Sequence, residues 1–212
     1  MSNNFKFVIG LTGNIACGKS TVLAQLQALG AFVIDADAVT RLVQQPGHPV
    51  LAAIVDAFGA QILHPDGQLN RKALADIVFN DTQQLRRLEA LVHPAVRQHV
   101  HDWLTQIPNG NAHTPHIVVI DAIKLIENGW PAVCDEVWVV TCSRETQIER
   151  LMQTRNMSRA DAIMRIDAQS PQATKIAAAD VVIPNDGILA DTQQFVDTQW
   201  HRIQHLMRYR AL

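Results

Sequence analysis

The sequence predicts a three-layer α/β fold, with a parallel sheet between helices, and the first 35 residues carry the main observations. Residues 5–11 form a short apolar run typical of a strand, residues 20–29 have helical character, and residues 31–34 make a second strand. A strand, a helix and a strand within about thirty residues form a βαβ unit, whose strands lie parallel in one sheet. Further strands are expected at residues 116–120, 136–140 and 181–183.

The turn between the first strand and the first helix carries a phosphate-binding motif. Residues 13–20 read Gly-Asn-Ile-Ala-Cys-Gly-Lys-Ser and match G-x-x-x-x-G-K-[ST]. In this motif the glycines let backbone N–H groups face phosphate oxygens, Lys19 can reach the outer phosphates, and the Ser20 hydroxyl can ligate Mg²⁺. The following helix adds the positive end of its dipole. An ordinary glycine-containing turn would not need this strand-loop-helix setting.

We therefore predict that this loop binds a nucleoside triphosphate, with Cys17 contributing its backbone rather than its thiol. The residues expected at the nucleotide are Gly13, Asn14, Ile15, Ala16, Cys17, Gly18, Lys19, Ser20 and Thr21.

Composition narrows the class of protein. With 212 residues, 48% of them hydrophobic, the chain can bury a core as one domain with room for an inserted subdomain. A net charge of -2 and the lack of a basic run argue against partners such as nucleic acid or a membrane surface. Neither a signal peptide nor a span of about 20 apolar residues is present. Three cysteines without C-x-x-C spacing predict neither zinc nor disulfides, which fits a cytoplasmic protein.

The middle of the chain differs from the sheet segments. We expect the sheet core at residues 1–45, 112–142 and 180–212. Residues 46–107 show helical patterns and turns but no strand, so we predict a helical insertion suited to holding a second substrate. Pro94 should kink or stop one of its helices, because proline disfavours helical geometry in the residue before it. That residue, His93, is either a helix cap or a substrate contact.

Carboxylates follow two of the predicted strands. Ligands of parallel sheets bind at the carboxyl ends of the strands, where Asp35, Asp37 and Asp121 are expected. One of the first two could bind metal-ligated water or accept a substrate proton. Alternatively, Asp37 could cap the following helix. Asp121 is expected at a metal or phosphate site behind the loop.

Residues 143–175 are rich in arginine and predict a mobile helical lid. Phosphoryl transfer spreads negative charge over the equatorial oxygens, and arginine donors stabilise that charge. Arg150 and Arg155 are the candidates for the donor phosphates. Other arginines, such as Arg144 and Arg159, are equally typical of a solvated helix face.

Together these stretches resemble the dephospho-coenzyme A kinase family over nearly the whole chain. The resemblance is carried by residues 9–21, by I-D-A-D-x-x-x-R at residues 34–41, by L-E-x-x-x-H-P at residues 88–94, and by R-I-D-A-Q at residues 165–169. It implies a P-loop kinase fold with a helical acceptor-binding insertion and a lid. It also implies transfer of the ATP γ-phosphate to the ribose 3′-hydroxyl of dephospho-CoA with Mg²⁺, the last step of coenzyme A synthesis.

By this resemblance, Asp37 is the catalytic base beside Lys19, Arg41 and the insertion contact the acceptor, and residues of about 145–170 form the lid. The candidate substrate contacts are Asp37, Arg41, His93, Asp121, Lys124, Arg165 and Gln169.

One stretch departs from the family pattern D-x-P-L-L-x-E. Here residues 121–127 have Ile123 in place of the proline and Lys124 in place of a leucine. Lys124 could contact an acceptor phosphate as a point charge. It could instead point to solvent or pair with Glu127 at i, i+3.

Three other functions fit the sequence less well. A GTPase would need an N-K-x-D guanine reader and a D-x-x-G after a strand, which are absent. A nucleoside or sugar kinase would share the fold and is the nearest alternative. A non-catalytic nucleotide-binding module would not need Lys19, Ser20 and Asp37 together.

Overall fold

The computed structural model describes residues 6–79, 81–111 and 115–209. Its backbone contacts divide the chain into two compact units. The sheet unit comprises Met1–Ile34 and Pro108–Leu212, and the helical unit comprises Asp35–Ile107. Among the described residues, no helix has the length and apolar character needed to cross a lipid bilayer.

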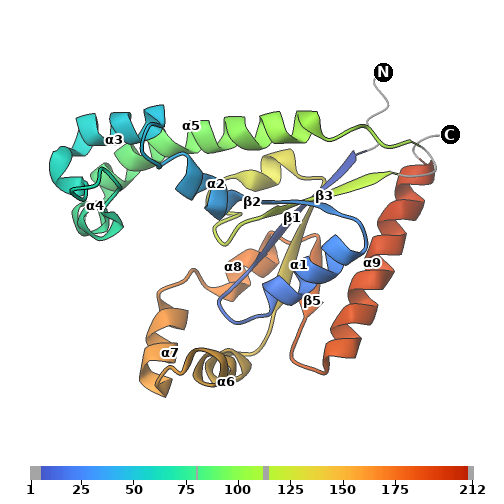
Figure 1. Ribbon diagram of the computed structural model, residues 1–212. Helices are drawn as coiled ribbons and strands as arrows, with labels where there is room; N and C mark the ends of the chain where they lie inside the picture. The colour runs from blue at the N-terminus through green and yellow to red at the C-terminus, as the bar shows by residue number, and fades with distance from the viewer. Residues whose placement is uncertain (1–5, 80, 112–114, 210–212) are drawn as a thin grey trace. The chain divides into compact units, whose positions relative to one another are not determined.

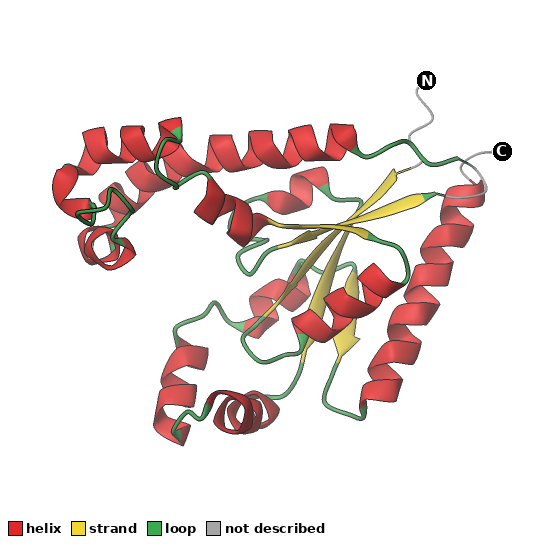
Figure 2. Ribbon diagram, in the orientation of Figure 1, coloured by secondary structure: helices red, strands yellow, loops and turns green. Residues whose placement is uncertain are grey.

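The sheet has five strands in the order β2-β3-β1-β4-β5 (Figures 1 and 2). The central strand β1 pairs in parallel with β3 and β4, and β4 pairs in parallel with β5. The α/β class with a parallel sheet is therefore confirmed. The strands are β1 (Lys6–Gly13), β2 (Phe32–Asp35), β3 (His116–Asp121), β4 (Glu136–Thr141) and β5 (Val181–Pro184).

Helices cover the sheet because its strands are apolar on both sides, as expected for parallel sheets. The helices of the sheet unit are α1 (Lys19–Ala28), α6 (Arg144–Arg155), α7 (Arg159–Asp167), α8 (Gln172–Ala177) and α9 (Leu189–Tyr209), with the 3₁₀ turn η2 (Trp130–Val133). Figure 1 shows α1 and α9 side by side, and both pack on one core with Phe7, Ile9 and Leu11 of β1. The short helices α8 and η2 contact β1.

The pair α6 and α7 forms a helical hairpin with its own small core of Ile148, Leu151, Ala162 and Ile166. Both helices have side-chain N-caps, because Ser143 accepts a hydrogen bond from Thr146 N and Ser158 accepts one from Asp161 N. Two bidentate pairs tie the hairpin together: Arg144 with Asp167, and Arg159 with Glu145. These arginines therefore belong to the structure of the hairpin.

The helical unit contains α2 (Ala36–Leu42), α3 (Pro49–Phe58), the 3₁₀ turn η1 (Ala60–Ile62), α4 (Arg71–Val78) and α5 (Thr82–Gln106). Asn70 and Asp81 cap α4 and α5, and each accepts hydrogen bonds from the first turn of its helix. Within the described part of this unit, the only β-type pairing is one isolated bridge between Leu63 and Leu69.

The expectation that a helix ends near Pro94 is wrong, because Pro94 lies inside the 25-residue helix α5. Proline removes the N–H that would donate to the carbonyl four residues earlier. The helix continues because Val92, Val96 and Val100 bury one apolar face on both sides of the proline. Tertiary packing thus offsets the local cost.

Candidate functional site

The phosphate loop has the backbone geometry that its glycines permit. Gly18, the N-cap of α1, has φ 88° in the left-handed region, and Ala16 has φ 61°. A Cβ on Gly18 would lie 2.0 Å from Asn185 Nδ2, so this position has no room for a side chain. Glycine is required here by conformation and by space.

Side chains of α6 and of the residue that follows β5 hold the loop from outside by its carbonyl groups. Gln147 Nε2 donates to Ile15 O at 2.7 Å, Arg150 Nη1 to Ala16 O at 3.2 Å, and Asn185 Nδ2 to Cys17 O at 2.7 Å. The Asn185 amide is itself oriented by Thr192 Oγ1, which donates to Asn185 Oδ1 at 2.9 Å. These carbonyls are directed outward, which suits a loop that offers N–H groups to an anion.

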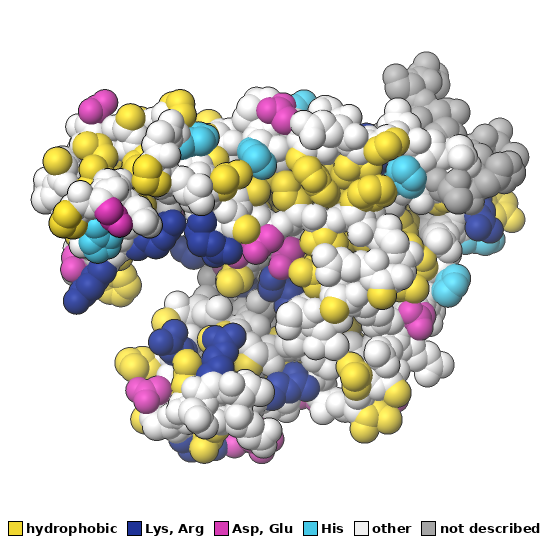
Figure 3. All heavy atoms as spheres, viewed as in Figure 1, with side chains coloured by type: hydrophobic (Ala, Val, Ile, Leu, Met, Phe, Trp, Pro, Cys, Tyr) yellow, Lys and Arg dark blue, Asp and Glu magenta, His cyan; other side chains and the backbone are white. Residues whose placement is uncertain are grey.

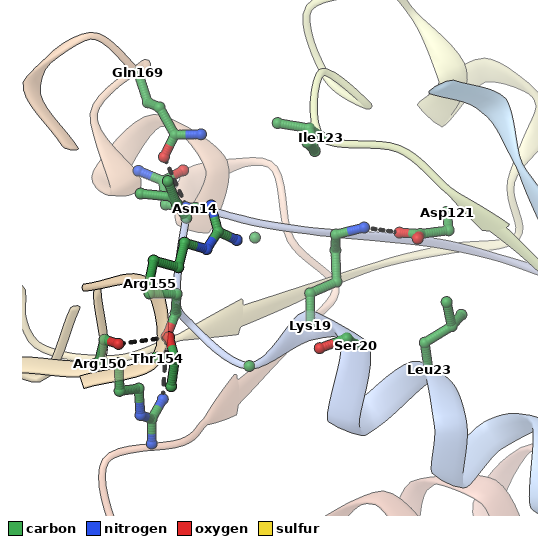
Figure 4. Close-up of a pocket in the computed structure, with 14 residues that line it drawn as sticks. Asn14, Lys19, Ser20, Leu23, Asp121, Ile123, Arg150, Thr154, Arg155 and Gln169 are labelled. Atoms are coloured by element: carbon green, nitrogen blue, oxygen red, sulfur yellow. Dashed lines mark hydrogen bonds and ion pairs between the residues drawn. The ribbon is translucent and has the colours of Figure 1, made fainter. Parts of the chain in front are cut away.

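A cavity of about 650 Å³ adjoins the loop within the sheet unit (Figure 4). It is bordered by the phosphate loop, by the start of α1, by the segment after β3, by the end of α6 and by the segment after α7. Its lining residues are Gly13, Asn14, Ile15, Ala16, Gly18, Lys19, Ser20, Leu23, Asp121, Ile123, Arg150, Thr154, Arg155 and Gln169. Most of the predicted nucleotide contacts therefore share one cavity.

A second cavity of about 230 Å³ shares Gly18 and Arg150 with the first. The other lining residues are Thr21, Asn185, Gly187 and Leu189. Leu189 is 52% exposed and its neighbour Ile188 is 68% exposed, so an apolar edge borders this smaller space.

Lys19 and Asp121 form an ion pair inside the larger cavity (Figure 4). Their side chains are only 18% and 10% exposed. The Lys19 ammonium points toward Asp121, so a bound phosphate must compete with this carboxylate for it. The structure thus pairs Lys19 with the carboxylate that was expected at a metal or phosphate site behind the loop.

The arginines of α6 lie at the cavity with different surroundings. Arg150 is committed to the protein, because it donates to Ala16 O and, at 2.7 Å, to Asn185 O. Arg155 lines the cavity from the last turn of α6. Arg165 lies on α7, outside the residues that line either described cavity. In Figure 3, Lys and Arg side chains gather over α6 and α7, which gives this segment a positive surface.

Cys17 lies behind the loop rather than in the cavity. It is 1% exposed, and its Sγ lies 3.5 Å from that of Cys142. The hydrogen bond from Cys142 lowers the pKa of the Cys17 thiol, and the same contact together with burial raises the pKa of Cys142. Thr21 likewise lies outside the larger cavity and lines the smaller one.

The segment after α7 is attached to the phosphate loop. Gln169 Oε1 accepts a hydrogen bond from Ile15 N at 2.7 Å, and Asn14 Nδ2 donates to Ser170 O at 3.1 Å. Asn14 Oδ1 is buried and has no hydrogen-bond partner among the described residues. Gln169, predicted as a substrate contact, here holds the loop backbone.

The N-cap of α2 is Asp35 rather than Asp37. Asp35 Oδ1 accepts a hydrogen bond from Ala38 N at 2.8 Å, and its Oδ2 lies 3.6 Å from Arg41. Asp37 lies in the first turn of α2, so the alternative that it is the cap is wrong. Asp37, Arg41 and His93 all belong to the helical unit.

Sequence reasoning missed the contacts of Lys175, a residue that is 2% exposed. Its Nζ donates to Ile123 O at 2.6 Å and lies 3.4 Å from Glu127 Oε1. Glu127 also accepts a hydrogen bond from Ser170 Oγ at 2.8 Å. The alternative that Glu127 pairs with Lys124 is therefore wrong, and Lys124 is exposed. The only signal was Lys175 itself, in a helix that was not predicted.

These contacts also affect the ionisation of Glu127. Burial acts to raise its pKa, but hydrogen bonds from its own backbone N–H and from Ser170, with the Lys175 ammonium nearby, bring the pKa below its ordinary value. Glu127 is therefore a carboxylate at neutral pH.

The described residues of the cavity offer oxygen atoms that could ligate a metal ion, but no cluster of such ligands. Among the described residues, no group of three or more His, Cys, Asp or Glu side chains could hold a metal ion. The Ser20 hydroxyl and the Asp121 carboxylate both line the cavity. This sparse oxygen set fits Mg²⁺, which is bound by one or two protein ligands together with substrate phosphates and water.

Comparison with known proteins gives one consistent result. A model described as dephospho-CoA kinase matches residues 7–191. A dephospho-CoA kinase from Moorella thermoacetica is 43% identical over 198 residues, which cover 93% of this chain and 92% of the relative. The crystal structure of TT1252 from Thermus thermophilus has a TM-score of 0.77 at 31% identity, covering 93% of this chain and 97% of that one. The dephospho-CoA kinase from Campylobacter jejuni has a TM-score of 0.66 at 27% identity, covering 94% and 98%.

Proposed function

Because the chain belongs to the dephospho-CoA kinase family, we propose that the cavity at its phosphate loop transfers the γ-phosphate of ATP to the ribose 3′-hydroxyl of dephospho-CoA. The products are CoA and ADP, and the reaction is the last step of coenzyme A synthesis. The observation that carries this proposal is the convergence of Lys19, Ser20, Asp121 and Arg155 on one cavity beside the phosphate loop.

The donor nucleotide is proposed to span both cavities. Backbone N–H groups of the loop and the N-terminus of α1 hold its phosphates in the larger cavity. The smaller cavity, with the apolar edge of Leu189 and the amide of Asn185, suits the base. Gly18 and Arg150 line both spaces and connect them.

Lys19 is proposed to change partners when ATP binds. Its ammonium leaves Asp121 for the β- and γ-phosphates, where it stabilises charge that develops during transfer. The exchange separates the Asp121 carboxylate from the Lys19 ammonium within the cavity. Ser20 and Asp121 would then be the protein oxygens nearest to a bound Mg²⁺, which supplies charge neutralisation between the phosphates.

The proposed contacts to the acceptor, dephospho-CoA, follow from the family resemblance. Asp37 is the proposed base for the 3′-hydroxyl, and Arg41 and His93 are proposed contacts of dephospho-CoA. Lys124, exposed on the segment after β3, and Arg165 on α7 complete the proposed substrate contacts. Arg155 is the arginine that we propose at the γ-phosphate, since Arg150 already donates to the carbonyls of Ala16 and Asn185.

The direct test is ADP release from ATP with dephospho-CoA, compared with a panel of nucleosides and sugars as acceptors. We expect dephospho-CoA to be used far better than any other acceptor. A nucleoside or sugar used as well would favour the rival small-molecule kinase. ATP hydrolysis without transfer to any acceptor would contradict the proposal.

We further expect residues of about 145–170 to close over the phosphates when both substrates bind. The reason is that closure excludes water, which would otherwise hydrolyse ATP. Hydrogen exchange with and without a bisubstrate analogue measures this, and protection should increase in α6 and α7. The buried strand β4 is the internal control, because its exchange should stay the same. Unchanged protection in α6 and α7 rules out closure.

A further inference from the structure

The segment after β3 forms a wall of the phosphate cavity and is tightly placed on β1. Ala122 N donates to Leu11 O at 3.1 Å, and Leu125 is fully buried. A Cβ on Gly10 would lie only 2.8 Å from Leu125 Cδ2, so strand and wall are in close contact. Between these anchors Ile123 lines the cavity, and its backbone is not restrained by the proline found there in the family pattern.

The Ile123 carbonyl has two donors from different parts of the chain. Thr12 Oγ1 of β1 donates to it at 3.0 Å, and Lys175 Nζ of α8 donates at 2.6 Å. The Lys175 side chain is 3% exposed, so the ammonium group that makes this contact is almost completely buried. Taking an ammonium out of water is costly, so a buried lysine needs an explanation.

Hydrogen-bond satisfaction alone does not explain it. Without Lys175 the Ile123 carbonyl would retain the Thr12 hydroxyl, and Glu127 Oε1 would retain Ser170 Oγ. Neither acceptor would be left without a donor. What the ammonium adds is a connection between the cavity wall at Ile123 and the segment at Ser170.

The segment at Ser170 is itself tied to the phosphate loop. Ser170 O accepts from Asn14 Nδ2, and the adjacent Gln169 accepts from Ile15 N. A continuous set of contacts therefore runs from the loop through residues 169–170 and Glu127 to Lys175, and on to the cavity wall. Of this set, Asn14, Ile15, Gln169 and Ile123 line the cavity where the phosphates are proposed to lie.

We propose, on the basis of the proposed function, that Lys175 is a positioning residue for phosphoryl transfer. Its buried ammonium fixes the wall at Ile123 and the base of the lid at Ser170 relative to the phosphate loop. The residue acts through the Ile123 carbonyl and the Glu127 carboxylate and does not touch the substrates. It therefore sets how accurately the acceptor hydroxyl and the γ-phosphate are aligned.

The test is Lys175→Met, which keeps a side chain of similar length in the buried site and removes the ammonium. Because a small misplacement far from the chemistry is costly, we expect kcat for CoA formation to fall about 10²-fold. The KM values for ATP and dephospho-CoA should change by less than about threefold, as expected when ground-state binding is preserved. The share of ATP hydrolysed without transfer should rise, since the site excludes water less well.

Two comparison variants separate positioning from stability. Ile203→Val removes a buried methyl group in α9, away from both cavities, and should lower Tm without changing kcat. Ser170→Ala removes the hydroxyl that joins Glu127 to the base of the lid. It should lower kcat several-fold, roughly 3- to 10-fold, with the same split between kcat and KM.

A kcat in Lys175→Met within about twofold of wild type overturns the proposal, as does a parallel loss of ATP affinity. If that variant does not fold, an unchanged kcat in Ser170→Ala overturns it instead. Wild-type protein that transfers no phosphate to dephospho-CoA would contradict the proposed function, which is a separate result.

Discussion

Replacing Lys19 with alanine should lower the rate of ADP formation by roughly 10²–10³-fold, the usual cost of removing one donor aimed at developing charge. The ammonium is the only lysine group that lines the larger cavity among the described residues. Steady-state ADP release, with a melting curve to show that the variant is folded, measures the effect. Near-normal turnover would contradict the assignment of residues 13–20 as the nucleotide-binding loop.

The Lys19–Asp121 ion pair calls for a matched control. Removing Lys19 alone leaves the Asp121 carboxylate, which is 10% exposed, facing the phosphates without its cation. The double variant Lys19→Ala with Asp121→Asn removes that repulsion. We expect it to remain inactive, because the missing ammonium is the cause. Recovered activity in the double variant would show that repulsion by Asp121 was responsible and that Lys19 is not a phosphate contact.

Asp37→Asn should lower turnover by about 10²–10⁴-fold, the range typical for loss of a general base. The amide keeps the shape of the carboxylate but cannot take the proton of the 3′-hydroxyl. Binding of ATP and of dephospho-CoA, measured by calorimetry, should change little. A large loss of acceptor affinity would instead make Asp37 a positioning residue.

Asp35→Asn is the comparison for that experiment. Asparagine caps helices as well as aspartate does, so its amide oxygen can still accept from Ala38 N and keep α2 in place. The variant removes the carboxylate two residues before Asp37 without removing the proposed base. Its loss of turnover should be clearly smaller than that of Asp37→Asn. Equal losses would leave no special role for Asp37.

The fold class follows from local signals in the sequence. Apolar runs at residues 31–34, 116–120, 136–140 and 181–183 correspond to β2, β3, β4 and β5 in the structure. The caps at Asn70, Asp81, Ser143 and Ser158 are local in the same way, because each cap is made between residues two or three apart. Such features depend on neighbours in the chain and can therefore be read from it.

The errors arise where distant residues outweigh local preference. Pro94 should end a helix by its own geometry, but the buried face of α5 carries the helix past it. Asp37 could cap a helix by its residue type, but α2 begins already at Ala36, and Asp35, in extended backbone conformation, is its cap. Helix α8 has only six residues, and its buried lysine resembles no apolar pattern.

The sequence by itself determined the nucleotide-binding loop, the parallel α/β sheet and the family, because those depend on a contiguous motif and on runs of apolar residues. Only the tertiary structure decided the partners within the site. Lys19 pairs with Asp121, which is 102 positions away in the chain. Lys175 donates to the carbonyl of Ile123, which is 52 positions away. Hydrogen bonds and ion pairs act over a few ångströms in space, and it is the order and packing of β1, β3 and α8 that bring these groups within that range.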